Sequence, residues 1–137
     1  MRQYLLDTGP LAAYLQGRPA ATGLISPWIQ QRAVATSLLV YAEVHEYLLG
    51  LPDYPRRHAQ LRRLMRESQP FALTYPALER YGELRRRLRP PHGPGLIGDI
   101  DALIAATALV RGLTVVTTDT DFQRVPGLTL QLLPSLR

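Results

Sequence analysis

Residues 96–108, LIGDIDALIAATA, set the organisation of this chain. Gly98 and Asp99 provide a turn and an N-cap, and residues 102–110 are strong helix formers without a breaker. The predicted helix is almost entirely apolar, so most of its surface should be buried. Asp101 falls on the apolar stripe of this helix and cannot simply point into bulk water. Two explanations of its charge stay open at this point: the helix dipole, which favours acids in the first turn, and a bound metal ion.

The length of 137 residues is typical of one domain, and no linker, repeat or low-complexity run divides residues 1–137. No apolar run approaches the ~20 residues that span a bilayer. Asp7 interrupts the apolar start of the chain before the core of a secretory signal could form. We therefore expect a cytoplasmic protein with no membrane segment. The absence of cysteine excludes disulfides, thiolate zinc sites and cysteine nucleophiles.

The net charge of +5 comes from 16 basic residues against 11 acidic ones, and every basic residue is arginine. Without lysine the chain can have neither a P-loop lysine nor a Schiff-base lysine. The arginines cluster at residues 56–57, 62–66 and 85–89. Guanidinium groups bind phosphate diesters well, so a polyanionic partner is one interpretation. Arginine-rich helix faces that are merely solvated explain the same pattern, and charge alone does not separate the two.

Short apolar strands alternate with helices from one end of the chain to the other. Strands are predicted at residues 3–6, 33–36, 71–73, 113–117 and 128–132. Helices are predicted at residues 11–16, 22–31, 38–49, 57–67, 76–88 and 102–110. This alternation predicts an α/β fold with a mostly parallel central sheet and helices on both of its faces.

Acidic residues stand where such a sheet places its ligands, beyond the carboxyl ends of the strands. Asp7 directly follows the first predicted strand, and Asp119 and Asp121 follow the fourth. Asp101 lies in the first turn of the helix that leads into the fourth strand. Glu43 lies about one and a half turns into the helix after the second strand. Each acid also has a structural explanation, as a cap, an Asx turn or a salt-bridged residue at a helix edge.

Acids that converge on one rim of a cationic protein would repel one another and raise one another's pKa values unless a cation is bound. The chain has no cysteine, and its histidines, His45, His58 and His92, are scattered. An oxygen-only donor set selects a hard ion, Mg²⁺ or Mn²⁺. Such an ion polarises a phosphoryl oxygen and lowers the pKa of its bound water. No serine elbow, histidine pair or glycine-rich phosphate loop competes for a catalytic role.

Four short motifs follow one another along the chain. They are LLDT at residues 5–8, SLLVYAE at 37–43, DALIAATA at 101–108, and VTTDTDF at 116–122 followed by VPGL at 125–128. Together they resemble the PIN-domain nucleases, and among these the VapC-type ribonuclease toxins of bacterial toxin–antitoxin modules. Each motif is weak alone, but all four in this order are specific and cover nearly the whole chain.

The resemblance implies a PIN-like three-layer fold and a Mg²⁺-dependent endoribonuclease that cleaves RNA. It implies an acidic catalytic quartet, Asp7, Glu43, Asp101 and Asp119. Within the quartet, Asp7, Asp101 and Asp119 would hold the metal, with Asp7 and Asp101 the firmest ligands. Glu43 would orient a second ion or the attacking water.

The same resemblance implies supporting roles for several neighbours. Thr8 and Thr117 would be hydroxyls behind the metal-binding acids, and Asp121 an auxiliary acid. Asp99 is interpreted as a helix cap. The resemblance further implies a homodimer and a cognate antitoxin that blocks the site. The alternative is a non-catalytic PIN-like module that binds RNA or a protein and keeps a metal only for structure.

Overall fold

The computed structural model describes residues 1–136, which form a five-stranded sheet in the order β3-β2-β1-β4-β5. Every neighbouring pair of strands is parallel. The strands are β1 (Tyr4–Leu6), β2 (Val34–Ser37), β3 (Gln69–Phe71), β4 (Thr114–Thr117) and β5 (Leu130–Leu132). The predicted α/β class is confirmed, and the sheet is wholly rather than mostly parallel.

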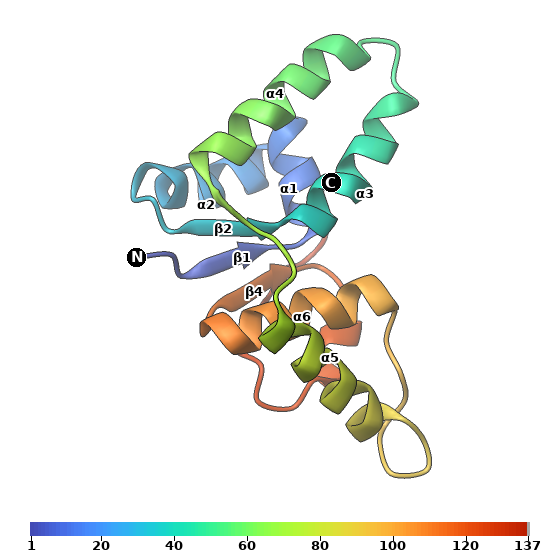
Figure 1. Ribbon diagram of the computed structural model, residues 1–137. Helices are drawn as coiled ribbons and strands as arrows, with labels where there is room; N and C mark the ends of the chain where they lie inside the picture. The colour runs from blue at the N-terminus through green and yellow to red at the C-terminus, as the bar shows by residue number, and fades with distance from the viewer. Residues whose placement is uncertain (137) are drawn as a thin grey trace.

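Helices cover both faces of this sheet. They are α1 (Thr8–Leu15), α2 (Pro19–Gln30), α3 (Leu38–Leu49), α4 (Tyr54–Glu67), α5 (Tyr75–Leu88), α6 (Asp99–Arg111) and the 3₁₀ turn η1 (Thr120–Arg124). Figure 1 shows α1 to α4 on one side of the strands and α5 and α6 on the other. Right-handed crossovers produce this distribution, because the chain moves outward from β1 to β3 and then returns to β4. The predicted three-layer arrangement is confirmed.

Prolines set several helix starts that the apolar periodicity placed too late. Helix α2 begins at Pro19 rather than at residue 22, and α4 begins at Tyr54, directly before Pro55, rather than at residue 57. The fixed φ of proline suits the first turn, where its missing N–H costs no hydrogen bond.

The predicted third strand, residues 71–73, is wrong by two positions. The ladder with β2 pairs Ala35 with Gln69 and Ser37 with Phe71, and there it ends. Pro70 is tolerated inside β3 because this strand lies at the edge of the sheet. The three apolar residues favoured position 71–73, but backbone pairing with β2 decided the strand.

The core lies on both faces of the two central strands. Leu5 and Leu6 of β1 and Val115 and Val116 of β4 are all fully buried, as expected for parallel strands covered on both sides. Helix α6 packs most of its small side chains into this core, which confirms that it is buried on most of its surface. None of the helices within residues 1–136 is long and apolar enough to cross a membrane.

The direction of winding changes between β1 and β4. From β1 the chain proceeds through β2 to β3, whereas β4 and β5 lie on the other side of β1. Parallel sheets bind ligands beyond the carboxyl ends of their strands at such a point. Asp7 follows β1 and Asp119 follows shortly after β4, so two of the predicted site residues stand at this reversal.

Candidate active site

Asp7 stands at the N-cap position of α1, but its side chain does not cap the helix. Its Oδ2 accepts a hydrogen bond from Thr117 Oγ1 at 2.7 Å. Its backbone N–H donates to Val116 O at 3.0 Å, which fixes the residue against β4. The side chain is buried, and Oδ1 has no hydrogen-bond partner within residues 1–136. The structural explanation of Asp7 as a cap is therefore wrong.

Burial raises the pKa of Asp7 above its ordinary value, and the carboxylates of Glu43 and Asp119 raise it further. The hydrogen bond from Thr117 acts in the opposite direction. A buried carboxylate with an unsatisfied oxygen is costly unless a positive partner meets it. Asp7 thus has the environment expected of a ligand whose partner is a cation.

Asp101 shows that the acids come together. It lies in the first turn of α6 and is partly buried. Desolvation, followed by the charges of Asp7, Asp119, Glu43 and Asp121, raises the pKa of Asp101 to about 7. The predicted mutual raising of pKa values is confirmed for Asp7 and Asp101. The acids, far apart in the sequence, act on one another across the reversal point of the sheet.

Glu43 faces Thr8 rather than an arginine. Thr8 Oγ1 donates to Glu43 Oε1 at 2.6 Å, which joins α3 to the start of α1. Within residues 1–136 no salt bridge includes Glu43, so its explanation as a salt-bridged edge residue is wrong. Glu46, one turn further along α3, is exposed.

Asp119 serves as a cap and also takes part in the acidic group. Its Oδ1 accepts a hydrogen bond from the backbone N–H of Asp121 at 2.9 Å and so caps η1. Its own backbone N–H donates to Thr117 Oγ1 at 3.0 Å. The Thr117 hydroxyl therefore accepts from Asp119 and donates to Asp7. The cap explanation holds for one oxygen of Asp119, and its charge still raises the pKa of Asp101.

Asp99 is not the cap of α6. Gly98 occupies the cap position, no side chain caps this helix, and Asp99 is its first residue. The Asp99 carboxylate instead accepts a hydrogen bond from Tyr81 Oη at 3.1 Å and forms an ion pair with Arg85. Interpreting Asp99 as a cap was wrong because a strong partner on α5 lies within reach of its side chain.

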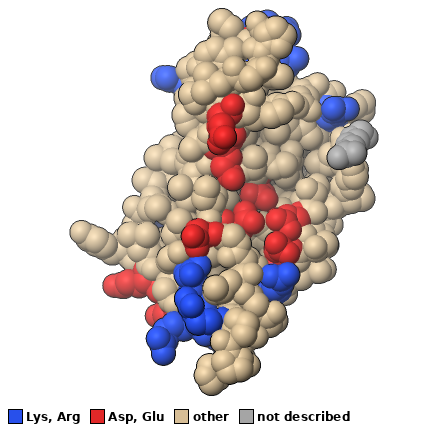
Figure 2. Space-filling view, turned by 90° about the vertical axis from the view of Figure 1, so that its right-hand side faces the viewer, with Lys and Arg blue, Asp and Glu red and all other residues tan. Residues whose placement is uncertain are grey.

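A second arginine, Arg124, lies beside Asp121. Arg124 Nη2 lies 3.3 Å from Asp121 Oδ1, and Arg124 Nη1 donates to Leu96 O at 3.0 Å. Figure 2 views the molecule at the carboxyl ends of the strands and shows acidic side chains in a strip across a hollowed part of the surface, with arginines at one end of it. The site is therefore an acidic hollow bordered by guanidinium groups.

Comparison with known proteins gives a family. The model of the PIN domain matches residues 4–128, which is most of the chain. The chain belongs to the PIN domain family. No curated protein matches it.

Solved structures share the PIN fold over nearly the full length. A chain of the VapBC2 complex of Rickettsia felis, bound to a DNA fragment from its promoter, has a TM-score of 0.83 at 23% identity, covering 95% of this chain and 98% of that one. A chain of DNA-bound VapBC from Salmonella typhimurium has a TM-score of 0.83 at 21% identity, covering 96% and 98%. A chain of a toxin–antitoxin complex from Klebsiella pneumoniae has a TM-score of 0.72 at 25% identity, covering 92% of this chain and 95% of that one. The predicted resemblance is confirmed in family and fold.

The acids of this PIN domain have the oxygen ligands that a hard cation requires, although their side chains are not arranged around one point. Within residues 1–136 no three acidic or histidine side chains are arranged so that they could hold one ion as they stand. Two observations support the fit. The donor set is oxygen only, and Asp7 has a buried carboxylate oxygen with no hydrogen-bond partner within residues 1–136.

The sequence did not single out the arginines that border the PIN site. Arg85 lies in an arginine run that gave no reason to prefer one member, and Arg124 lies outside every run. The available signal for Arg124 was its spacing of three residues from Asp121, because residues at this spacing face each other in a helical turn. Nothing local linked Arg85 to Asp99.

Proposed function

We propose that this PIN domain is a Mg²⁺-dependent endoribonuclease that hydrolyses RNA phosphodiester bonds, and that it is the toxin of a type II toxin–antitoxin pair. The observation that carries the proposal is the environment of Asp7. Its Oδ1 is buried and has no hydrogen-bond partner within residues 1–136. Desolvation, followed by the charges of Asp7 and three other acids, raises the pKa of the neighbouring Asp101 to about 7. Such an arrangement is unfavourable without a cation and suited to one.

Asp7, Asp101 and Asp119 would hold Mg²⁺, or Mn²⁺ in its place, and Glu43 would orient a second ion or the attacking water. When bound, the metal supplies charge that polarises a phosphoryl oxygen and activates water. The hydroxyl groups set the geometry of the acids. Thr117 holds one oxygen of Asp7 and leaves the other free, and Thr8 fixes one oxygen of Glu43.

The substrate class follows from charge. The chain carries a net charge of +5, yet several of its acids gather in one hollow. A polyanion is therefore attracted to the surface around the hollow rather than to the hollow itself. Arg85 and Arg124 border the acids and donate to phosphate oxygens readily. An RNA backbone guided by these arginines would present one phosphodiester to the acids.

The partner proposal rests on the structural neighbours. Those described above are named as VapBC or toxin–antitoxin complexes. We propose that an antitoxin protein likewise covers the acidic hollow of this chain, that the chain forms a homodimer, and that it acts on RNA in the cytoplasm.

The test is cleavage of RNA by purified protein with Mg²⁺, with EDTA, and by an Asp101→Asn variant. Asn preserves the shape of Asp101 but removes the charge that a hard cation needs, so we expect cleavage to disappear while the circular dichroism spectrum is retained. Glu46→Gln, an exposed acid on α3, is the matched control and should cleave as the wild type does. Metal-independent RNA binding without cleavage by the wild type would favour the non-catalytic module instead.

A further inference from the structure

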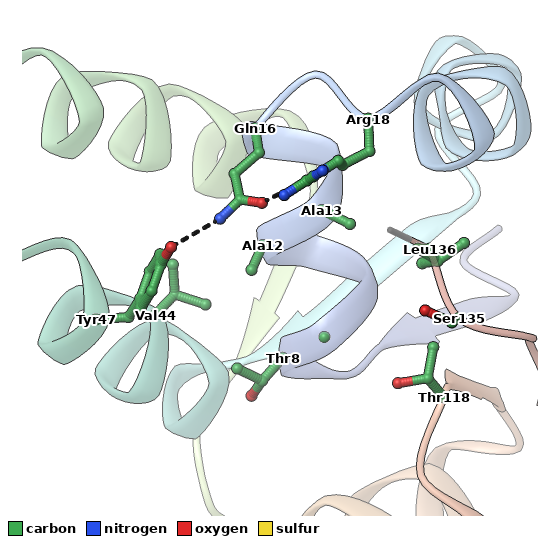
Figure 3. Close-up of a pocket in the computed structure, with 11 residues that line it drawn as sticks. Thr8, Ala12, Ala13, Gln16, Arg18, Val44, Tyr47, Thr118, Ser135 and Leu136 are labelled. Carbon is green, nitrogen blue, oxygen red and sulfur yellow. Dashed lines mark hydrogen bonds between the residues drawn. The ribbon is translucent and has the colours of Figure 1, made fainter. Parts of the chain in front are cut away.

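A cavity of about 680 Å³ opens between α1 and α3, directly beside the acids. Thr8, which donates to Glu43, lines one end, and Gln16 and Arg18 line the other. Helix α1 rises ~1.5 Å per residue, so Gln16 lies roughly 12 Å from Thr8 along the helix. Figure 3 shows Thr118, Ser135 and Leu136 lining this space on the side opposite α3. The cavity is within reach of nucleotides next to a phosphate held at the acids.

A chain of hydrogen bonds crosses the far end of the cavity. Arg18 Nε donates to Gln16 Oε1 at 3.2 Å, and Gln16 Nε2 donates to Tyr47 Oη at 3.0 Å (Figure 3). The guanidinium group of Arg18 can only donate, so the Gln16 amide must turn its oxygen toward Arg18. One N–H and one lone pair of this amide remain available. Gln16 is exposed, so this donor and this acceptor are accessible to a ligand.

The rest of the lining suits the flat face of a base. Ala12, Ala13 and Val44 provide small apolar walls, and Tyr47 is 51% exposed. Aromatic rings stack on the bases of single-stranded nucleic acid, whichever base it is. Among residues 1–136 the lining includes Arg18 and no acidic side chain, so its charge complements a nucleotide.

We propose that this cavity binds a nucleobase of the RNA substrate next to the scissile phosphate, with Gln16 reading its edge and Tyr47 stacking on its face. The inference rests on the proposed function. A glutamine amide pairs in bidentate fashion with adenine, which presents an adjacent donor and acceptor, so adenine is the preferred base. No strand lines the cavity within residues 1–136, so it offers no edge along which an extended peptide could pair.

The test uses short RNA oligonucleotides that differ only in the nucleotide beside the mapped cut, with each of the four bases in turn. A bidentate base contact gives roughly tenfold discrimination, and we expect the wild type to cleave the adenine oligonucleotide at least that much faster than the poorest one. Gln16→Ala should reduce this ratio to within about twofold. Tyr47→Phe keeps the ring but loses the hydroxyl that holds Gln16, and should reduce the ratio less.

Two further variants sharpen the test. Gln16→Glu keeps the shape of the side chain but replaces the amide donor with an acceptor, so the preference should move from adenine towards cytosine, whose amino group donates. Gln31→Ala is the matched control, because Gln31 is the exposed C-cap of α2 with nearly the backbone conformation that Gln16 has at α1. It should keep the wild-type ratio.

The outcomes separate this inference from the proposed function. If the wild type cleaves RNA and Gln16→Ala keeps its base preference, the inference fails and the ribonuclease stands. If the wild type cleaves no RNA, fluorescence anisotropy with the same oligonucleotides decides: a base preference in binding that Gln16→Ala removes supports the cavity as a nucleobase site, and its absence overturns it. If Gln16→Ala weakens only the binding of an antitoxin peptide, the cavity belongs to a protein partner and the inference is overturned.

Discussion

The hydroxyl of Thr117 donates a hydrogen bond to the carboxylate of Asp7 across 110 residues of sequence, with 2.7 Å between Thr117 Oγ1 and Asp7 Oδ2. The register of β1 on β4, which pairs Leu6 with Val116, brings the two side chains together. The same hydroxyl accepts a hydrogen bond from the backbone N–H of Asp119. Thr117 therefore connects two of the predicted metal ligands, and its proton is committed to Asp7.

Replacing Thr117 with valine should destabilise the protein by about 1–3 kcal/mol, because a buried carboxylate oxygen loses its donor while the shape of the side chain is kept. Urea unfolding of the metal-free protein at neutral pH measures the change. Thr114→Val, on the same strand but only partly buried, is the control and should have a much smaller effect. Equal effects of the two variants would show that the Thr117–Asp7 contact contributes nothing specific.

Asp7→Asn should alter the response of stability to metal in two opposite ways. In EDTA the variant should melt at or above the wild-type temperature, since removing one of several neighbouring carboxylates relieves repulsion. In Mg²⁺ the order should reverse. The wild type gains roughly 2.7 kcal/mol at a hundredfold excess of metal over Kd, and a variant that cannot bind gains almost none.

Thermal melts in EDTA and in saturating Mg²⁺ measure both effects of Asp7→Asn. Asp53→Asn is the control, because Asp53 pairs with Arg56 and Arg57 at the start of α4. It should gain as much stability from Mg²⁺ as the wild type does. An equal gain in the Asp7→Asn protein would mean that Asp7 is not a ligand.

The metal-free protein should lose stability as the pH rises from about 4 to above 7. Folding raises the pKa of Asp101 from 3.8 to about 7, so the folded state favours the protonated form. The stabilisation from protonated Asp101 is complete below the pKa that this residue has in the unfolded chain. It is lost as the pH rises through the pKa that Asp101 has in the folded protein. Burial raises the pKa of Asp7 as well, which adds to the effect in the same direction.

Denaturant midpoints in EDTA between pH 4 and pH 8 measure this dependence. Asp101→Asn should flatten the curve over this range, since the variant has no titrating group at this position. Mg²⁺ affinity should show the opposite trend and rise through pH 7, because only the deprotonated carboxylate binds the ion. A wild-type curve parallel to that of the variant would contradict the raised pKa.

RNA affinity should fall steeply with salt when it is measured with the Asp101→Asn protein, because arginines that bind phosphates release counterions. Arg124→Gln should reduce the salt slope by about 0.7, the value for one phosphate contact on a single strand. Arg62→Gln, an exposed arginine of α4 on the other side of the sheet from α5 and α6, is the control and should keep the wild-type slope. Affinity that is independent of salt would mean that the arginines bind no RNA backbone.

Local patterns were enough to predict the layers of the fold and the end of the sheet that holds the acids. Residues 96–108 contain no breaker beyond Gly98, and helix α6 covers Asp99–Arg111. Ser37 directly precedes α3 and caps it, with its Oγ accepting from the N–H of Leu39. These features depend on intrinsic helix propensity, capping and apolar periodicity, which operate within a few residues. Parallel strands then carry the acids that follow them to one edge without further information.

Only the tertiary structure decided which side-chain atoms of the site have hydrogen-bond or ion-pair partners. The register of β1 on β4 left one oxygen of Asp7 without a hydrogen-bond partner within residues 1–136. The packing of α5 on α6 brought Arg85 into an ion pair with Asp99. The contact of α1 with α3 joined Gln16 to Tyr47 and formed the cavity beside the acids. Each of these pairs is separated by many residues, so no local propensity encodes it. Their distances follow from how whole strands and helices pack, and that packing is settled by the burial of the common core.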